Sequence, residues 1–302
     1  MFPFADELFL PAAGRLSLAL AGALGLIVTA ERHRLRELRH HVLFLRWKTW
    51  ALTAPLFGAA AMGPKVFAGV FVAALALQGM REYARLTELP RAYRTALYIA
   101  GVASAPVALA SLTVWRAMPP VLLIAATAAP VMMQDAREGI RHLAYAALGF
   151  AYIPWLLTYF ILVREHVVGG PGVLLALGTA VAASDVFAFI FGKLFGRRPL
   201  APTLSPNKTL EGVGGNLVGA YLGFGLMSFA LPAAMPMWMR WVLPVVVAIG
   251  CLWGDLVESL LKRQFGVKDA GDCLPGFGGL LDRIDSLLIV LPIAYTVIVV
   301  AG

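Results

Sequence analysis

The feature that most constrains the fold is a succession of apolar runs that recurs along all 302 residues. A helix of about 20 apolar residues crosses a hydrocarbon core about 30 Å thick. The composition agrees, because 60% of the residues are hydrophobic and 14% are charged, whereas soluble domains have about 45–50% and about 25%. We therefore expect an all-α, polytopic integral membrane protein with about nine to ten transmembrane helices, and not a soluble enzyme, a disordered chain or a fibrous repeat.

The apolar runs give the expected positions of the spans. They lie at 9–30, 49–63, 66–80, 95–114, 119–133, 143–163, 172–192, 212–231, 238–261 and 286–301. The second and third runs are short for a span and fit a tilted, half-inserted or hairpin segment as well.

Basic residues alternate between the loops that join these runs. The odd-numbered loops hold 20 Lys and Arg residues, and the even-numbered loops hold four, Lys65, Arg116, Arg164 and Arg240. Because cytoplasmic loops are the basic ones, this alternation predicts odd loops inside and both termini outside. The net charge of +8 then serves orientation and contact with membrane lipids, and no nucleic-acid partner is expected. We expect a bacterial-type inner membrane, because we find no organelle-targeting segment.

The composition also divides the chain into two parts. Residues 1–170 are apolar runs with Arg-rich connections, which is typical of a transmembrane scaffold. Residues 171–302 have inner loops rich in Asp, Glu, Lys, Ser, Thr and Gly. We predict a catalytic region there, folded with the scaffold as one membrane unit.

Asp185 lies within the seventh apolar run. A carboxylate at membrane depth costs several kcal/mol unless it is paired, metal-bound or in a wet cavity. Two interpretations follow: a structural partner for a basic residue on another helix, or part of a metal or phosphate site.

The loop after this run contains three prolines, at 199, 202 and 206, which preclude a helix. Ser205 and Pro206 favour a turn, and a helix is expected to begin near Thr209. Lys208 and Thr209 would then lie at a helix N-terminus, where free N–H groups attract phosphate.

Glycines in the helix that follows, at 212, 215 and 219, indicate close helix packing. The spacing of the last two fits a homodimer and internal packing equally well.

The segment 254–286 carries the densest polar pattern. Two groups each share a helix face by their spacing: Asp255, Ser259 and Lys262, and Asp282, Asp285 and Ser286. Clustered carboxylates without Cys or His suit Mg²⁺ or Mn²⁺ and not zinc. The basic residues beside them, which suit a polyphosphate, are Lys262, Arg263, Lys268 and Arg283. The alternative is an ordinary charged connection that only orients the protein.

At these residues the sequence resembles the phosphatidate cytidylyltransferase (CDP-diacylglycerol synthase) family. The family signature is Ser-x-hydrophobe-Lys-Arg, four residues, Lys-Asp, a small residue, Pro-Gly-His-Gly-Gly, then Asp-Arg-hydrophobe-Asp. Matching positions are Ser259, Lys262, Arg263, Lys268, Asp269, Gly271, Leu274, Pro275, Gly278, Gly279, Asp282, Arg283 and Asp285. Further matches are Asp185, Leu200-Ala201-Pro202, the segment from Ser205 to Gly212, and Arg81-Glu82-Tyr83.

Two positions depart from the family pattern. Phe277 stands where the signature has His, and phenylalanine neither titrates nor binds metal. Leu210 stands where the family commonly has Trp. Together they suggest a divergent branch. If the signature His touches substrate, this protein would be slower or would use a different phospholipid or nucleotide; if that His only packs the turn, nothing changes.

The resemblance implies that CTP and phosphatidate, or a related lipid phosphate, give CDP-diacylglycerol and pyrophosphate at the cytoplasmic face. It implies a Mg²⁺ (or Mn²⁺) ion, with a monovalent cation as a further candidate. The catalytic residues would be Asp255, Asp282, Lys208 and Lys262. The metal ligands would be Asp185, Asp255, Asp282 and Asp285, and the substrate contacts Ser205, Thr209, Glu211, Ser259, Arg263, Lys268, Asp269 and Arg283. Glu211 would ligate the metal or hold Lys208, and Arg283 would brace Asp185 or Asp285 or contact phosphate.

Two other functions remain open at the level of the sequence. One is a CTP-dependent transferase or kinase that acts on another lipid phosphate or a polyprenol. The other, from a different class, is an ion or lipid transporter that uses Asp185 and Asp255 as intramembrane ligands. Release of pyrophosphate would indicate transfer of CMP, and release of CDP would indicate kinase chemistry. Transport across a vesicle membrane without turnover of nucleotide would indicate a transporter.

Overall fold

The computed structural model describes residues 6–30, 42–267, 271 and 278–301. Its elements are α1 (Asp6–Ala30), α2 (Val42–Met62), α3 (Lys65–Leu86), α4 (Arg91–Ala110), α5 (Leu112–Ala126), α6 (Ala128–Met132), α7 (Gly139–Phe150), the π-helical segment η3 (Ala151–Trp155), α8 (Tyr159–His166), α9 (Gly170–Phe195), β1 (Pro199–Ala201), β2 (Ser205–Thr209), α10 (Leu210–Leu226), the 3₁₀ segment η4 (Ser228–Ala230), α11 (Met237–Gln264) and α12 (Leu281–Ala301).

The all-α membrane fold is confirmed, because every predicted apolar run lies largely in one helix or in consecutive helical segments. Within the described residues, six segments are long and apolar enough to cross a membrane: Leu8–Gly25, Leu112–Met132, Gly139–His166, Gly170–Phe195, Met237–Gln264 and Leu281–Ala301. The other predicted runs form α2, α3 and α4, which contain basic residues, and α10, which has 17 residues. A membrane crossing by these four helices stays a prediction.

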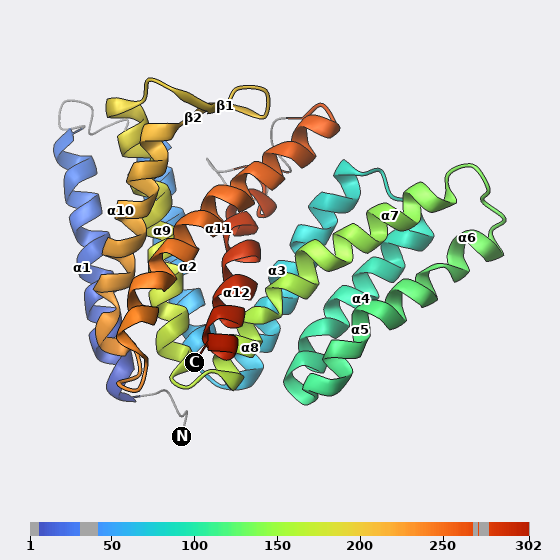
Figure 1. Ribbon diagram of the computed structural model, residues 1–302, viewed down its shortest axis with the longest axis horizontal. Helices are drawn as coiled ribbons and strands as arrows, with labels where there is room; N and C mark the ends of the chain where they lie inside the picture. The colour runs from blue at the N-terminus through green and yellow to red at the C-terminus, as the bar shows by residue number, and fades with distance from the viewer. Residues whose placement is uncertain (1–5, 31–41, 268–270, 272–277, 302) are drawn as a thin grey trace.

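Successive apolar segments run in alternate directions (Figure 1). α1 begins and α12 ends at the same end of the molecule, at the bottom of the view. The described connections 87–90, 133–138 and 196–209, which we predicted to face the cytoplasm, lie at the opposite end. The alternation of basic loops therefore corresponds to a real separation in space. Which end faces the cytoplasm stays a prediction.

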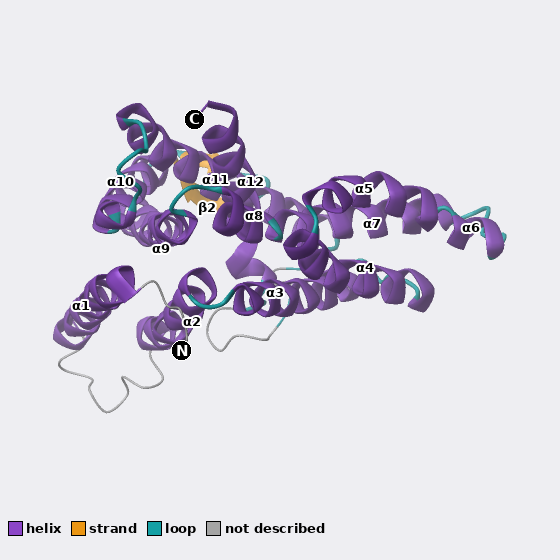
Figure 2. Ribbon diagram, turned by 90° about the horizontal axis from the view of Figure 1, so that it is seen from below, coloured by secondary structure: helices purple, strands orange, loops and turns teal. Residues whose placement is uncertain are grey.

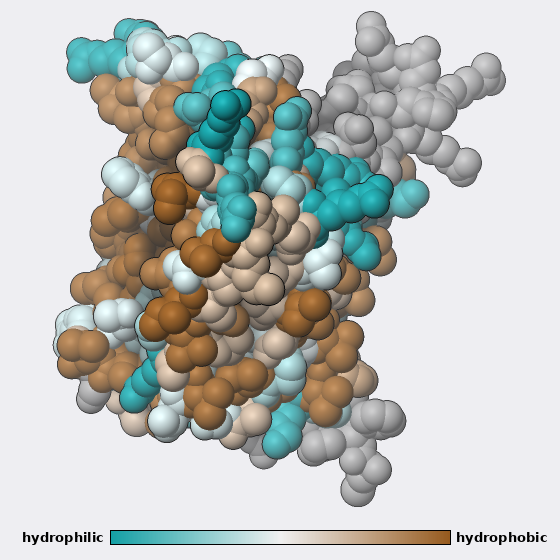
Figure 3. Space-filling model, turned by 90° about the vertical axis from the view of Figure 1, so that its right-hand side faces the viewer, coloured by the Kyte–Doolittle hydropathy of each residue, from teal (hydrophilic) through white to brown (hydrophobic). Residues whose placement is uncertain are grey.

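The surface and the layout fit a protein surrounded by lipid. Figure 3 shows a face that is mostly hydrophobic, with hydrophilic atoms gathered toward the end that carries the predicted cytoplasmic loops. Seen from below, α4, α5, α6 and α7 extend to one side of the other helices (Figure 2). Exposed apolar side chains on this extension include Val121, Ile124 and Ile140. Contact with acyl chains explains their exposure without a loss of hydrophobic stabilisation.

Two basic residues, Arg164 and Arg240, lie at the end opposite the predicted cytoplasmic loops and donate hydrogen bonds to backbone carbonyl groups. The Arg164 guanidinium donates to the Ala61 carbonyl at 3.1 Å and to the Gly63 carbonyl, at the end of α2. Arg240 donates to the Pro232 carbonyl at 3.0 Å. Arg164 thus satisfies carbonyl groups at the C-terminal end of α2, and Arg240 adds a second donor to the Pro232 carbonyl, which also accepts the Met235 N–H at 3.0 Å.

The proline-rich loop is non-helical, as predicted, and forms a short antiparallel hairpin. Pro199 lies opposite Thr209 and Ala201 lies opposite Ser205. The turn lies just before Ser205 and not at Ser205-Pro206. Thr209 is the N-cap of α10, and its Oγ1 accepts a hydrogen bond from the Gly212 N–H at 3.1 Å, which confirms the predicted start of this helix.

Glycines hold α10 directly against α9. A Cβ added at Gly215 or Gly219 would lie 2.4 Å from the carbonyl oxygen of Phe187 or Ala183, and one at Gly223 would lie 2.3 Å from that of Thr179. Real Cβ atoms do not approach that closely, so only glycine permits this contact. The predicted close helix packing is confirmed and is internal. A homodimer stays a prediction that this spacing does not support.

A second glycine contact joins α11 to α12. A Cβ at Gly254 would lie 2.5 Å from the Asp285 carbonyl oxygen, and one at Gly250 would lie 2.6 Å from a methyl group of Val290. The two helices therefore approach most closely next to Asp255 and Asp285. This approach places the polar faces of both helices side by side.

We expect Gly254→Ala to lower the free energy of unfolding by about 1–3 kcal/mol, because the added methyl group forces α11 and α12 apart. Thermal unfolding of the purified protein in detergent measures the effect. Gly214→Ala is the matched control, because Gly214 lies on α10 with no atom within 4 Å of an added Cβ. Equal stability of the two variants would contradict the assigned role of Gly254.

Candidate active site

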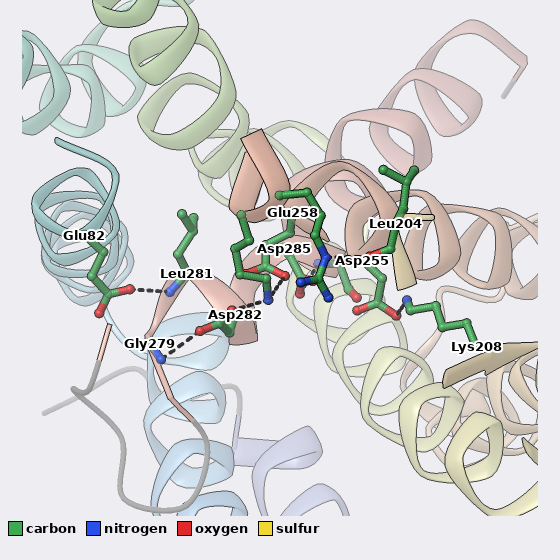
Figure 4. Close-up of polar contacts among 12 residues, drawn as sticks. Glu82, Leu204, Lys208, Asp255, Glu258, Gly279, Leu281, Asp282 and Asp285 are labelled. Atoms are coloured by element: carbon green, nitrogen blue, oxygen red, sulfur yellow. Dashed lines mark hydrogen bonds and ion pairs between the residues drawn. The ribbon is translucent and has the colours of Figure 1, made fainter. Parts of the chain in front are cut away.

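The candidate site lies where α11 and α12 approach, near the end of the molecule that carries the β1–β2 hairpin (Figures 1 and 4). α11 contributes Asp255, Glu258 and Lys262, which lie one helical turn apart. α12 contributes Asp282 and Asp285 from its first turns. The shared faces predicted from spacing are therefore turned toward each other.

Lys262 lies between two carboxylates. Its Nζ is 2.5 Å from Glu258 Oε2 and 2.7 Å from Asp282 Oδ1. As whole residues, Glu258 and Asp282 are 4% and 8% exposed, so all three charges are largely removed from water. A buried charge persists only when it is paired and hydrogen-bonded, and this cluster meets that condition in part. Glu258 Oε1 is buried and has no hydrogen-bond partner.

A second cluster gathers around Asp255. The Lys208 ammonium, carried by β2, forms an ion pair with Asp255 Oδ2 (Figure 4). Asp185 of α9 and Asp285 of α12 both interact electrostatically with Asp255. Arg283 and Lys208 act on Asp185 with the opposite sign. The four segments predicted to supply the site therefore converge. Arg283 acts on Asp185 electrostatically, and its role as a brace or as a phosphate contact stays a prediction.

The two clusters differ in their access to solvent. The side chains of Lys208 and Asp255 are 24% and 40% exposed, whereas those of Glu258 and Asp282 are 6% and 5% exposed. Asp285 is also buried. The pair of Lys208 and Asp255 is therefore the more accessible of the two to solvent.

The hairpin that carries Lys208 is fixed by contacts on both sides. Arg263 Nε donates to the Leu204 carbonyl at 3.1 Å, which ties the hairpin to α11. Glu211 Oε2 accepts from the Arg197 and Arg198 N–H groups at 3.0 and 3.3 Å. These backbone donors, that of Arg197 foremost, lower the pKa of Glu211.

The Glu211 carboxylate caps the turn before β1, and Lys208 forms its ion pair with Asp255 and not with Glu211. Ligation of a metal by Glu211, its other predicted role, stays a prediction. A carboxylate that accepts two backbone N–H groups remains ionised and orders the turn. Thr209 likewise uses its hydroxyl to cap α10.

The remaining predicted residues are placed as follows. Ser205 lies at the start of β2 and Ser259 lies on α11 one turn after Asp255; both are half-buried. Lys268, Asp269 and Phe277 lie outside the described residues.

Two residues of the first half of the chain also reach the site. Glu82 of α3 is 2% exposed, and its Oε1 and Oε2 accept the N–H groups of Leu280 and Leu281 at 2.9 and 2.8 Å. The Tyr152 hydroxyl, in η3, is buried without a hydrogen-bond partner and interacts electrostatically with Asp285 and Glu258. The Arg81-Glu82-Tyr83 match was a signal for Glu82, whereas nothing in the sequence marks Tyr152.

The predicted four-carboxylate metal site is not assembled in the part of the chain that is described. No three acidic, His or Cys side chains there are arranged to hold one ion. Lys208 and Lys262 instead engage Asp255 and Asp282. The donor set is nonetheless of the kind that Mg²⁺ prefers, and Glu258 Oε1 is a buried oxygen with unused acceptor capacity.

Known proteins similar to this chain include phosphatidate cytidylyltransferases of three bacteria. That of Staphylococcus haemolyticus (strain JCSC1435) is 38% identical over 159 residues, which are 53% of this chain and 57% of that protein. That of Mycobacterium leprae (strain TN) is 40% identical over 148 residues, 49% of this chain and 47% of that protein. That of Thermotoga maritima (strain ATCC 43589 / DSM 3109 / JCM 10099 / NBRC 100826 / MSB8) is 37% identical over 173 residues, 54% of this chain and 62% of that protein.

These matched regions mean that the chain spans about half the length of the curated relatives it matches. The family model extends further and covers residues 44–301, which includes every described element from α3 to α12. On that match the chain belongs to the cytidylyltransferase family.

Proposed function

We propose that this protein is a phosphatidate cytidylyltransferase, which converts CTP and phosphatidate to CDP-diacylglycerol and pyrophosphate. The observation that carries the proposal is the convergence of carboxylates and lysines from α9, β2, α11 and α12 at one end of an apolar helical protein. The names of the similar bacterial proteins support the same substrate and nucleotide.

The reaction needs no nucleophile from the protein. A phosphate oxygen of the lipid attacks the α-phosphorus of CTP, a new P–O bond forms, and the bond to the β-phosphate breaks to release pyrophosphate. Both reactants are anionic, so the barrier is dominated by charge repulsion and by alignment. The task of the side chains is to hold the two phosphates in line and to offset their charge.

We assign these tasks to the basic residues around the two clusters. Lys208 and Lys262 hold the triphosphate and stabilise the leaving pyrophosphate, with Arg263 and Lys268 as outer contacts. In the structure each of the two lysines is bound to a carboxylate. On binding, the lysines exchange these carboxylates for phosphate oxygens.

The carboxylates released in this way are those we assign to Mg²⁺ or Mn²⁺. Asp255 and Asp282 would hold the ion, with Asp185 and Asp285 as further ligands or as their support. When bound, such an ion offsets negative charge on the phosphates. The lipid would be held by its acyl chains among the helices, and CTP would arrive from the cytoplasm.

We expect Asp255→Asn and Asp282→Asn each to lower the rate of CDP-lipid formation at least 100-fold, because each removes a charge from the cluster. The measurement is turnover of labelled CTP with Mg²⁺ and phosphatidate by purified, folded protein. Asp135→Asn is the matched control, since Asp135 lies on the α6–α7 connection and accepts the Glu138 N–H at 3.0 Å. Activity of either site variant within threefold of wild type would reject the assignment.

A second prediction concerns the products and the ion. With a panel of lipid phosphates, we expect pyrophosphate and CDP-lipid in equal amounts, and no turnover after chelation of divalent ions until Mg²⁺ or Mn²⁺ is restored. Release of CDP would indicate kinase chemistry. Turnover in the presence of excess chelator would contradict the proposed need for a divalent ion.

A further inference from the structure

Glu82 makes contacts that no role in the reaction explains. It lies on α3, in the first half of the chain, and its carboxylate is buried beside the start of α12 (Figure 4). Gln78, one turn earlier on α3, donates to Glu82 Oε1 at 2.9 Å. The carboxylate is therefore held in place from its own helix.

Three successive N–H groups at the start of α12 are divided between two carboxylates. The N–H groups of Leu280 and Leu281 go to Glu82, at 2.9 and 2.8 Å. The Gly279 N–H goes to Asp282 Oδ2 at 2.8 Å. This division leaves Asp282 Oδ1 for Lys262, at 2.7 Å.

The backbone at Gly279 lies between the carboxylates of Glu82 and Asp282, and a larger residue would not fit there. A Cβ at Gly279 would lie 2.6 Å from Glu82 Oε2 and 3.0 Å from Asp282 Oδ2. A Cβ at Gly271 would lie 3.0 Å from Glu82 Cδ. Gly271 and Gly279, both matches to the family signature, therefore allow the backbone to lie against Glu82.

Free N–H groups at a helix N-terminus attract the nearest anion. Without Glu82, the Leu280 and Leu281 N–H groups would compete with Lys262 for Asp282. We infer that Glu82 is a positioning residue: it occupies these donors and so keeps Asp282 directed at Lys262. The effect on catalysis rests on the proposed function. The anchoring of the start of α12 by Glu82 rests only on the hydrogen bonds to Leu280 and Leu281.

The test compares Glu82→Ala and Glu82→Gln in the purified full chain. We expect amide hydrogen exchange at Leu280 and Leu281 to become at least tenfold faster in Glu82→Ala. We expect kcat for CDP-lipid formation to fall at least tenfold, with KM for CTP within threefold, because the nucleotide contacts remain. Glu82→Gln keeps one carbonyl acceptor and should give intermediate values of both the exchange rate and kcat.

Glu88→Ala is the matched control, because Glu88 follows the same helix and is exposed; its exchange rates and kcat should equal those of wild type. A kcat of Glu82→Ala within threefold of wild type would overturn the positioning role, and unchanged exchange at Leu280 and Leu281 would overturn the anchor. If Glu82→Ala does not fold, the kcat of Glu82→Gln and its exchange rates at Leu280 and Leu281 test the positioning role and the anchor instead. If wild type does not turn over CTP, the proposed function fails while the exchange rates still decide the anchor.

Discussion

The constraint on which the rest of the structure depends is the mutual repulsion of clustered carboxylates, of which Glu258, Asp282 and Asp285 are buried. Asp185, Asp255, Glu258, Asp282 and Asp285 gather within one group, and the bases that face them are Lys208, Lys262 and Arg283. Burial of an unpaired ion costs several kcal/mol even after relaxation. Acidic residues formally outnumber basic ones in this group, and protons or a bound cation would offset the difference.

Glycine residues allow the apolar helices to approach closely enough to bring these carboxylates together. Gly254 brings the α11 backbone against the Asp285 carbonyl, and Gly215 and Gly219 do the same for α10 against α9. Between membrane helices there is no hydrophobic driving force, so close backbone contact and hydrogen bonds supply the association. Asn216 of α10 adds such bonds, to Ser184 of α9 and to the Ala248 carbonyl of α11. The scaffold that positions the carboxylates is thus built from the smallest side chains.

The sequence was sufficient for relations within one helix and insufficient for relations between distant segments. Apolar length gave the helices, and i, i+4, i+7 spacing gave the shared face of Asp255 and Lys262, because both follow from helix geometry. Glu82 escaped assignment because its partners, Leu280 and Leu281, are nearly 200 residues away and are backbone N–H groups, which leave no pattern in side-chain identity. Tyr152 escaped because an aromatic residue in an apolar run is typical of packing.

The ion pairs also explain how a site for anions can persist before its substrates arrive. A lysine left without a partner in a low-dielectric setting would lose its charge, and an unpaired carboxylate would bind a proton. Lys208 is paired with Asp255 and Lys262 is paired with Asp282, so each of these charges lies beside one of opposite sign. Under the proposed function, phosphate oxygens would take the place of the carboxylates beside the lysines, and a divalent cation would take the place of the lysines beside the carboxylates, so that each charged group would again have a partner of opposite sign. The pair of Lys208 and Asp255 is the more exposed of the two, so an incoming anion would meet it before the buried pair.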